Sequence, residues 1–447
     1  IIERALGQSL AYDIIKDYSQ DNKNQTQSLD SKTFSLLNTY EDEFIRHRPV
    51  MDIQPNAHYE ELFLAAYGAK GQAFQNRGVW QLNTGSEDDP AGVVCVWSLA
   101  LPARPEFKFT SSSPVLTSHF HPAEKNIIVG GCYSGQILLW DMRAKALPVQ
   151  RSNLAGKGHK HPVYSLAMLG SGSVYELVTA STDGTLCHWD LARLSEPTNA
   201  TPIMSNTNPS GTAQSSSDWT TPVNVTSMAF GHGDTSRDVV LGSECGRLFR
   251  TSVPIRPREA VSQVNGHLGL VTAMNIHPNS SKLFKNLLLT SSLDWSVKLW
   301  NLNLSTEPLL EFQTPTYDYV CDVQWSPTHP ALFSTITSGG ILSLWNLCKS
   351  TVEPLDSMTI TNEPTVSDSL KTAITTPSAA LNRAVWSLDG RRIMAGDAKG
   401  TVHMVSIAET TAKAKVGDES RFELAILHRK DSQLQGQSAD SIPAPRS

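Results

Sequence analysis

Several features that would point to a membrane, to nucleic acid or to catalysis are missing from this 447-residue sequence. No apolar run approaches the roughly 18 residues of a membrane helix, so we expect no membrane insertion. Lys and Arg number 37 against 43 Asp and Glu, a net charge of −6, whereas nucleic-acid binders carry a basic stripe. The G-x-S-x-G, H-E-x-x-H and G-x-x-x-x-G-K-[ST] motifs are also absent. We therefore expect no nucleic-acid partner, no enzyme activity and no cofactor.

Closely spaced metal or disulfide cysteines are lacking as well. The six cysteines are scattered with no C-x-x-C pair, which favours buried free thiols in a reducing compartment. His119 and His121 form a close pair, but His121 takes the position before Pro that His277 and Ser326 fill in other repeats, which indicates a turn residue. His159 and His161 lack a nearby carboxylate or cysteine partner. We expect no metal site.

What the sequence does contain is a repeat. A tight turn followed by an alternating strand ends five times in tryptophan, at Trp97, Trp140, Trp189, Trp300 and Trp345. Two degenerate copies run over 246–251 and 400–405. Two further alternating segments precede each copy, and period-two alternation is typical of half-buried strands. Seven units of about 40–60 residues predict an all-β fold, a seven-bladed β-propeller with four-stranded blades.

The repeat also suggests where the domain begins and ends. We predict the propeller over 44–410, preceded by a helical or extended linker over 1–43 and followed by a helical, then disordered tail over 411–447. Two polar segments, 196–222 and 351–378, are predicted as loop insertions. Because the first residue is Ile1 and not Met, we interpret the sequence as a fragment whose natural N-terminus lies upstream.

Two repeats share a His, a turn Asp and a terminal Trp: His159, Asp183 and Trp189 in the third, and His267, Asp294 and Trp300 in the fifth. A buried His needs a hydrogen-bond partner, and a turn Asp supplies one, so we interpret these residues as structural. The pattern resembles the WD-repeat family, in which His, Ser or Thr, Asp and Trp hydrogen-bond across one blade. Trp140 and Trp345 belong to the same structural set.

Longer runs, over 133–151, 291–300 and 317–333, resemble the dynein intermediate chains much more closely than WD repeats in general. The resemblance covers nearly the whole chain apart from the two insertions. It implies a non-catalytic subunit of the cytoplasmic dynein motor, in the cytoplasm on the microtubule cytoskeleton. In that family the propeller docks on the heavy-chain tail, and the region upstream of residue 1 would bind light chains and dynactin and so attach cargo. A second intermediate chain is expected in the complex.

Three alternatives stay open. The chain could be an axonemal dynein intermediate chain, or a substrate-receptor WD-repeat scaffold of another complex. A propeller hydrolase would need carboxylates and histidines clustered at the central channel, and the sequence shows no such cluster.

We predict the docking face where the loops between blades meet the tight turns. Aromatic and Arg side chains dominate protein interfaces, and the candidates of these types, with one His, are Tyr133, His161, Tyr164, Trp295, Tyr317, Tyr319 and Arg383. Trp295 stands where sister repeats carry Gly, at a cost in turn propensity. Either it packs on a neighbouring loop, or it forms part of the heavy-chain surface with Tyr317 and Tyr319.

Overall fold

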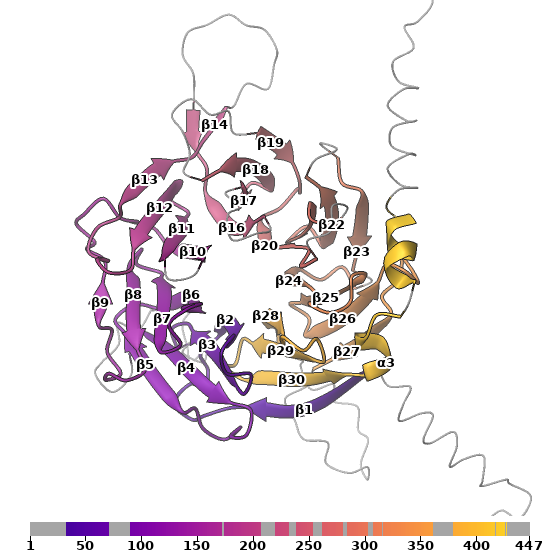
Figure 1. The fold of residues 1–447 in the computed structure, drawn as a ribbon, viewed down its shortest axis with the longest axis horizontal. Coiled ribbons are helices and arrows are strands. Elements are labelled where there is room, and N and C mark those ends of the chain that lie inside the picture. The colour runs from indigo at the N-terminus through magenta and orange to yellow at the C-terminus, as the bar shows by residue number, and fades with distance from the viewer. Residues whose placement is uncertain are drawn as a thin grey trace, which may run out of the picture.

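Seven four-stranded sheets are arranged around a central channel, as Figure 1 shows. The computed structural model describes residues 33–70, 90–171, 174–206, 220–231, 238–253, 262–279, 284–302, 307–314, 316–360, 379–415, 417–424 and 426. The predicted seven-bladed β-propeller is confirmed. The predicted helix before residue 33 and the tail beyond residue 426 lie outside the described residues.

Each blade runs from an innermost to an outermost strand. Blade one has β2 (Val50–Pro55), β3 (Leu62–Tyr67), β4 (Gly92–Ser98) and β5 (Phe107–Ser111). Blade two has β6 (Val115–Phe120), β7 (Ile127–Cys132), β8 (Ile137–Asp141) and β9 (Gln150–Arg151). Blade three has β10 (Val163–Ser171), β11 (Val174–Ser181), β12 (Thr185–Asp190) and β13 (Asn199–Pro202). Blade four has β16 (Val225–Phe230), β17 (Asp238–Ser243), β18 (Arg247–Ser252) and β19 (Ser262–Asn265).

The remaining blades repeat this plan. Blade five has β20 (Val271–Ile276), β21 (Leu287–Ser292), β22 (Ser296–Asn301) and β23 (Leu310–Gln313). Blade six has β24 (Val320–Trp325), β25 (Leu332–Thr337), β26 (Ile341–Asn346) and β27 (Asp356–Thr359). Blade seven has β28 (Leu381–Trp386), β29 (Arg392–Asp397), β30 (Val402–Ile407) and, outermost, β1 (Phe34–Tyr40). A separate hairpin pairs β14 (Met204–Asn206) with β15 (Thr220–Pro222).

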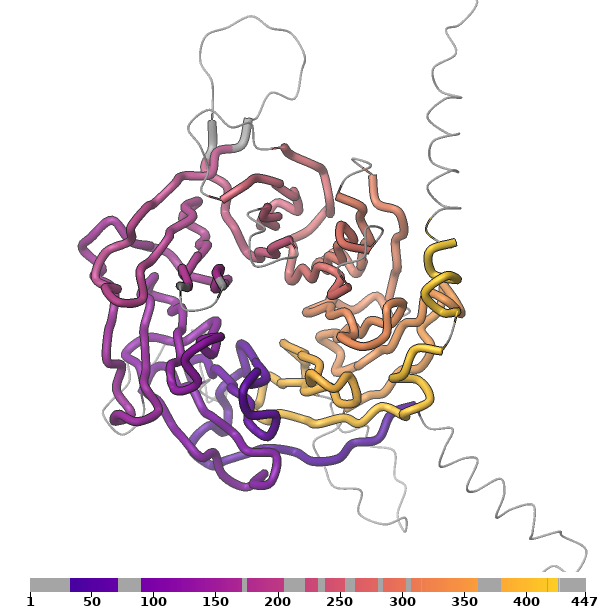
Figure 2. Tube along the Cα trace, viewed as in Figure 1, coloured from indigo at the N-terminus to yellow at the C-terminus, as the bar shows by residue number. Residues whose placement is uncertain are grey.

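The two ends of the propeller close the ring together. The first described strand, β1, pairs antiparallel with β30, so blade seven combines both ends of the domain. Figure 2 shows this seam, where the indigo and yellow segments run side by side. The predicted start of the propeller at residue 44 was therefore too late, because it left β1 out.

The two predicted loop insertions also contain blade strands. The outermost strands β13 and β27 lie inside the segments 196–222 and 351–378. Their sequences, Asn-Ala-Thr-Pro and Asp-Ser-Met-Thr, each hold a single apolar side chain other than proline, so neither shows the repeated apolar alternation by which inner strands are recognised. The prediction that these segments are loops throughout was wrong for these residues.

The core lies between the blades. The third strand of five blades ends in a buried tryptophan, at Trp97, Trp140, Trp189, Trp300 and Trp345, as the repeat predicts. Each cluster of buried apolar side chains joins adjacent blades, as where Phe312 of blade five meets Phe333 and Trp345 of blade six. Burial of this shared surface holds the ring closed.

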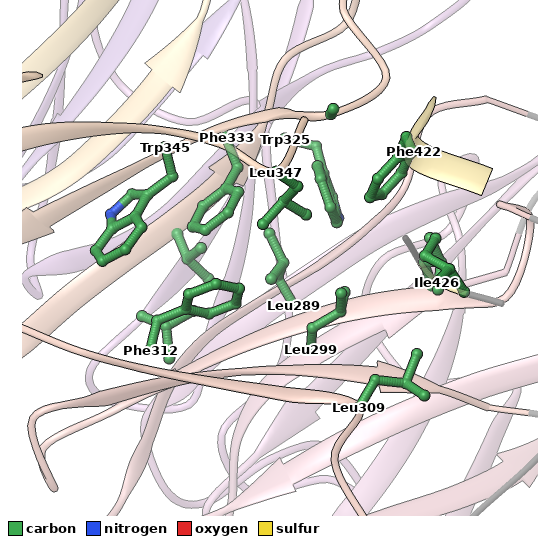
Figure 3. Packing of buried hydrophobic residues seen from close by; sticks show 14 of the residues in the cluster. Leu289, Leu299, Leu309, Phe312, Trp325, Phe333, Trp345, Leu347, Phe422 and Ile426 are labelled. Atoms are coloured by element: carbon green, nitrogen blue, oxygen red, sulfur yellow. The ribbon is translucent and has the colours of Figure 1, made fainter. Parts of the chain in front are cut away.

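The chain that follows blade seven runs back over blades six and five. The short helix α3 (Glu409–Ala412) ends in the buried Ala412, and residues 418–424 form a second helix. Phe422 and Ile426 are buried in the cluster that joins blades five and six, as Figure 3 shows. Part of the predicted C-terminal tail is thus packed on the propeller.

Candidate docking face

The His and Asp side chains picked out in the sequence hydrogen-bond within their blades. In blade three, His159 Nδ1 lies 3.1 Å from an Asp183 carboxylate oxygen, and its Nε2 lies 2.7 Å from the Thr179 hydroxyl. The Trp189 indole donates to the same hydroxyl at 2.8 Å. His159 and Trp189 are fully enclosed, so this network ties the loop entering the blade to its second and third strands.

Blade five repeats the network with the same geometry. His267 lies 3.0 Å from Asp294 and 2.7 Å from the Thr290 hydroxyl, to which Trp300 donates at 2.9 Å. The threonine that joins His to Trp was not singled out in the sequence, although its position ten residues before the Trp is the same in both blades.

Other blades keep only part of this network. Trp345 donates to the Thr335 hydroxyl at 3.1 Å. The Trp140 indole nitrogen is buried with no hydrogen-bond partner among the described residues, and Gly130 occupies the position of the threonine.

The protonation of the blade-three pair follows from these contacts. Burial is the largest single influence on the pKa of His159 and lowers it, but the hydrogen bonds with Asp183 and Cys187 and the charge of Asp183 together outweigh burial and raise that pKa to about 9. Burial raises the pKa of Asp183, and the bonds with His159 and Thr185 reverse this and bring it down to about 2. The pair is therefore an ion pair near neutral pH, held inside the blade.

Trp295 occupies a backbone conformation that favours glycine. Tight turns between the second and third strands carry glycines of positive φ, such as Gly135 at 88° and Gly340 at 80°. Trp295 stands at this position in blade five with φ of 66°, and Tyr317 in the next loop has φ of 53°. A positive φ costs a non-glycine residue roughly 1–2 kcal/mol, and such strain is a reason to look for function.

The two strained residues present their rings together. Trp295 and Tyr317 meet edge to face with centroids 6.2 Å apart, and Thr314 N donates to Trp295 O at 3.2 Å. Both rings stay accessible nonetheless, at 45% for Trp295 and 66% for Tyr317. Tyr319, which precedes β24, is 50% exposed. Trp295 therefore packs on a neighbouring loop and forms an exposed aromatic pair with Tyr317. We call these two residues and the exposed Tyr319, two positions after Tyr317, the aromatic patch.

A second group of predicted residues lies beside blades three and four. His161 and Tyr164 line a depression of about 490 Å³ together with side chains of blades four and five, among them Thr226, Leu270 and Thr272. Both His161 and Tyr164 are exposed, as is Tyr133 in the turn of blade two. These residues come from loops and turns at the same end of the strands as Trp295, so they share one face of the ring.

Arg383 does not join the aromatic residues. Its guanidinium Nε lies 3.3 Å from Asp52 of blade one and 3.6 Å from Asp322 of blade six, at the innermost strands. Asp322 raises the pKa of Arg383, and burial raises the pKa of Asp322 itself. Arg383 therefore links three blades across the seam.

These two carboxylates were missed by the sequence analysis, which found no cluster at the channel. Asp52 also accepts from Thr117 and from Ser118 N of blade two, at 2.9 and 3.0 Å. Asp322 accepts from Ala384 N of blade seven at 3.0 Å. Each carboxylate thus bonds to the next blade, which points to a role in closing the ring.

An irregularity that the innermost strands share positions Asp52, Asp322 and Arg383. The innermost strand of every blade has a register shift after its first residue, as between Val50 and Asp52 or Val320 and Asp322. A β-bulge re-aims the side chains that follow it. A bulge leaves no period-two signal in the sequence, so the positions of Asp52, Asp322 and Arg383 could not be read from alternation.

The described part of the chain has neither a metal-ligand cluster nor a membrane-spanning helix. No group of three or more His, Cys, Asp or Glu side chains there is arranged to hold a metal ion. None of its helices is both long and apolar enough to span a membrane.

Comparison with known proteins adds the following. Residues 90–170 match the family described as "Dynein axonemal intermediate chain 3 WD40 domain", and residues 151–190 and 258–301 match "WD domain, G-beta repeat". Cytoplasmic dynein 1 intermediate chain of Drosophila melanogaster is 34% identical over 440 residues, which cover 97% of this chain and 59% of that protein. Dynein axonemal intermediate chain 2 of Rattus norvegicus is 28% identical over 370 residues, covering 81% and 55%. The chain thus spans somewhat more than half the length of these relatives.

The seven blades, the buried His–Asp and Trp–Thr bonds and the WD-domain matches define a WD-repeat β-propeller. Within this class the chain belongs with the dynein intermediate chains, because its similarity to one of them extends over 97% of its residues. The resemblance drawn from the sequence is confirmed.

Proposed function

We propose that this chain is a non-catalytic intermediate-chain subunit of the cytoplasmic dynein complex and that its propeller docks on the tail of the heavy chain. The observation that carries the proposal is the 34% identity to a cytoplasmic dynein intermediate chain over 97% of the sequence. In that role the subunit scaffolds light chains, a second intermediate chain, dynactin and cargo in the cytoplasm, for transport toward microtubule minus ends.

We place the docking surface on the face that carries the aromatic patch of Trp295, Tyr317 and Tyr319. Two residues with strained backbones display rings to solvent there, although glycine at the Trp295 turn would avoid part of the strain. Large aromatic side chains are the commonest energetic anchors of protein interfaces. Tyr133, His161 and Tyr164 extend this surface toward blades two to four, whereas Arg383 acts within the ring.

The test is a variant that combines Trp295→Ala with Tyr319→Ala, assayed for binding to the heavy-chain tail. Losing one anchor costs about 2 kcal/mol, or roughly thirtyfold in affinity. Both residues are exposed, so we expect an unchanged melting temperature. A matched control, Leu101→Ala, removes an exposed apolar side chain from the loop between β4 and β5, at the other end of the strands. Wild-type affinity in the folded double variant would show that the heavy chain binds elsewhere.

An axonemal role is the second candidate, because residues 90–170 match an axonemal intermediate-chain family. Co-purification separates the two roles. A cytoplasmic heavy chain and dynactin are expected with the tagged chain, and outer-arm components in their place would favour the axonemal role. Recovery of neither, with an unrelated complex in their place, would favour a scaffold of another kind.

A further inference from the structure

The C-terminal helix shows how a groove between two blades can be filled. On the face opposite the aromatic patch, Phe422 from the 418–424 helix enters between blades five and six. Its ring centroid lies 5.0 Å from that of Phe284, 6.2 Å from His277 and 6.3 Å from Trp325. Figure 3 shows Phe422 and Ile426 approaching the blade side chains. The groove thus accepts an aromatic side chain presented by a helix.

The groove between blades seven and one is built from matching positions. Its lining includes Phe63, Leu99, Met394 and Met404. Aligned by strand and by distance from the strand ends, these side chains take the places of four members of the cluster that buries Phe422, namely Phe333, Leu347, Leu289 and Leu299. At the positions of Trp325 and His277, whose rings contact Phe422, the second groove has the smaller Pro55 and Ser387.

The loops that frame the two grooves are held by matching hydrogen bonds. In blade six, the Ser326 hydroxyl accepts from the backbone N–H groups of Thr328 and His329. In blade one, the Asn56 side-chain oxygen accepts from His58 N and Tyr59 N, at 2.8 and 3.1 Å. The strand pairings that follow also match, since Asn56 N donates to Leu62 O at 3.0 Å and Ser326 N to Leu332 O at 2.9 Å.

No described residue fills the second groove. It encloses a cavity of about 190 Å³, which among the described residues is lined by blades seven and one. An apolar cavity of about 150 Å³ accommodates benzene, so a phenyl ring fits this space. Leu388 stands at the edge of the cavity and is 50% exposed.

The charge at the rim differs between the two grooves. Pro330 and Ala331 frame the occupied groove, and the acidic residues of the bound helix find neutral or basic partners there, with Asp418 3.5 Å from His329. The matching positions of the open groove are Glu60 and Glu61, both exposed, and Asp389 lies opposite them. Among the described residues that line this groove, Arg392 alone is basic. An acidic helix like the 418–424 helix would be repelled here, whereas a basic one would be attracted.

We propose that the groove between blades seven and one binds a helix of a partner protein that inserts an aromatic side chain and carries basic residues beside it. This site lies on the face opposite the aromatic patch, so it is independent of heavy-chain docking there. It would give the propeller a second partner surface.

The test uses the full chain and a fluorescent peptide derived from residues 416–430, with Asp418→Lys, Glu419→Arg and Glu423→Lys. We expect binding that weakens as salt increases, because exposed charges are screened. A matched peptide that also carries Phe422→Ala should bind roughly thirtyfold more weakly. A photo-reactive phenylalanine at position 422 of the basic peptide should cross-link to Met394, Met404 or Leu99.

A charge swap in the chain provides the decisive control. The variant that combines Glu60→Lys with Glu61→Lys should bind the basic peptide roughly tenfold more weakly, and should prefer the unmodified acidic peptide. Glu353→Lys changes an exposed charge on blade six and should leave the affinity unchanged. No peptide binding, equal binding by the Phe422→Ala peptide, or cross-links to blades five and six would each overturn the proposal.

Discussion

Replacing Asp183 by Asn should remove an ion pair that stabilises blade three and, with it, a specific dependence of stability on pH. Asn keeps the side-chain oxygen that accepts from Thr185 N at 2.9 Å. It lacks the charge that holds His159 protonated, and it places an amide donor against Lys160 N. The change is therefore nearly isosteric and mainly electrostatic.

The magnitude follows from the pKa of His159. A pKa raised from 6.5 to about 9 corresponds to about 3 kcal/mol of preference for the charged form in the folded state. A raised pKa of a base stabilises the fold below the unfolded value and loses that effect as the pH rises through the folded value. The contribution is thus complete below about pH 6.5, still about 2–3 kcal/mol at pH 7, and nearly gone by pH 10.

The assay is urea unfolding at pH 7 and at pH 10 for wild type and Asp183→Asn. We expect wild type to lose about 2 kcal/mol more stability than the variant over this interval, since groups that titrate in both proteins cancel. As a control, Asp141→Asn breaks the Asp141–Arg143 ion pair at the surface and should cost under about 1 kcal/mol. Equal losses in wild type and Asp183→Asn would refute the proposed ion pair.

Four further substitutions test other parts of the structure. Trp295→Gly should not lower the melting temperature, because relief of roughly 1–2 kcal/mol of backbone strain offsets the lost ring contact; a clear drop would mean that the turn is not strained. Thr290→Val should cost about 3 kcal/mol in chemical unfolding, since Trp300 and His267 lose their shared partner. Thr337→Val removes a buried hydroxyl that has no partner among the described residues and should be neutral or stabilising, so similar costs for the two variants would contradict the assigned network. Phe422→Ala should cost about 3 kcal/mol of helix packing and speed hydrogen exchange over 417–424, and unchanged exchange would show that the helix is held in another way.

The blades could be predicted from the sequence because the inner strands and the tight turns can each be recognised from a few consecutive residues. Alternation and the turn glycines mark Trp97, Trp189 and Trp345 at equivalent strand ends before any contact is known. Outermost strands such as β13 and β27 carry polar side chains on both faces and lose that signal. They form because an inner strand offers free backbone groups, which the sequence of the outer strand does not reveal.

Features that depend on closure of the ring could not be predicted from the sequence. Arg383 was predicted at the docking face, yet it meets Asp322 of the neighbouring blade six and Asp52 of blade one, and closure of the ring brings Asp52 within 4 Å. The packing of Phe422 on blades five and six likewise depends on the path of the chain after blade seven. The unusual turn position of Trp295, in contrast, could be recognised in the sequence, because a bulky residue stands there where the other repeats carry glycine.

The most direct test of the dynein assignment is the stoichiometry of co-purification from cells that express the tagged full chain. We expect a cytoplasmic dynein heavy chain at stoichiometric yield after a high-salt wash, measured by quantitative mass spectrometry. Trp295→Ala combined with Tyr319→Ala should lower that yield at equal expression. Recovery of the folded wild-type chain without any dynein heavy chain would contradict the assignment.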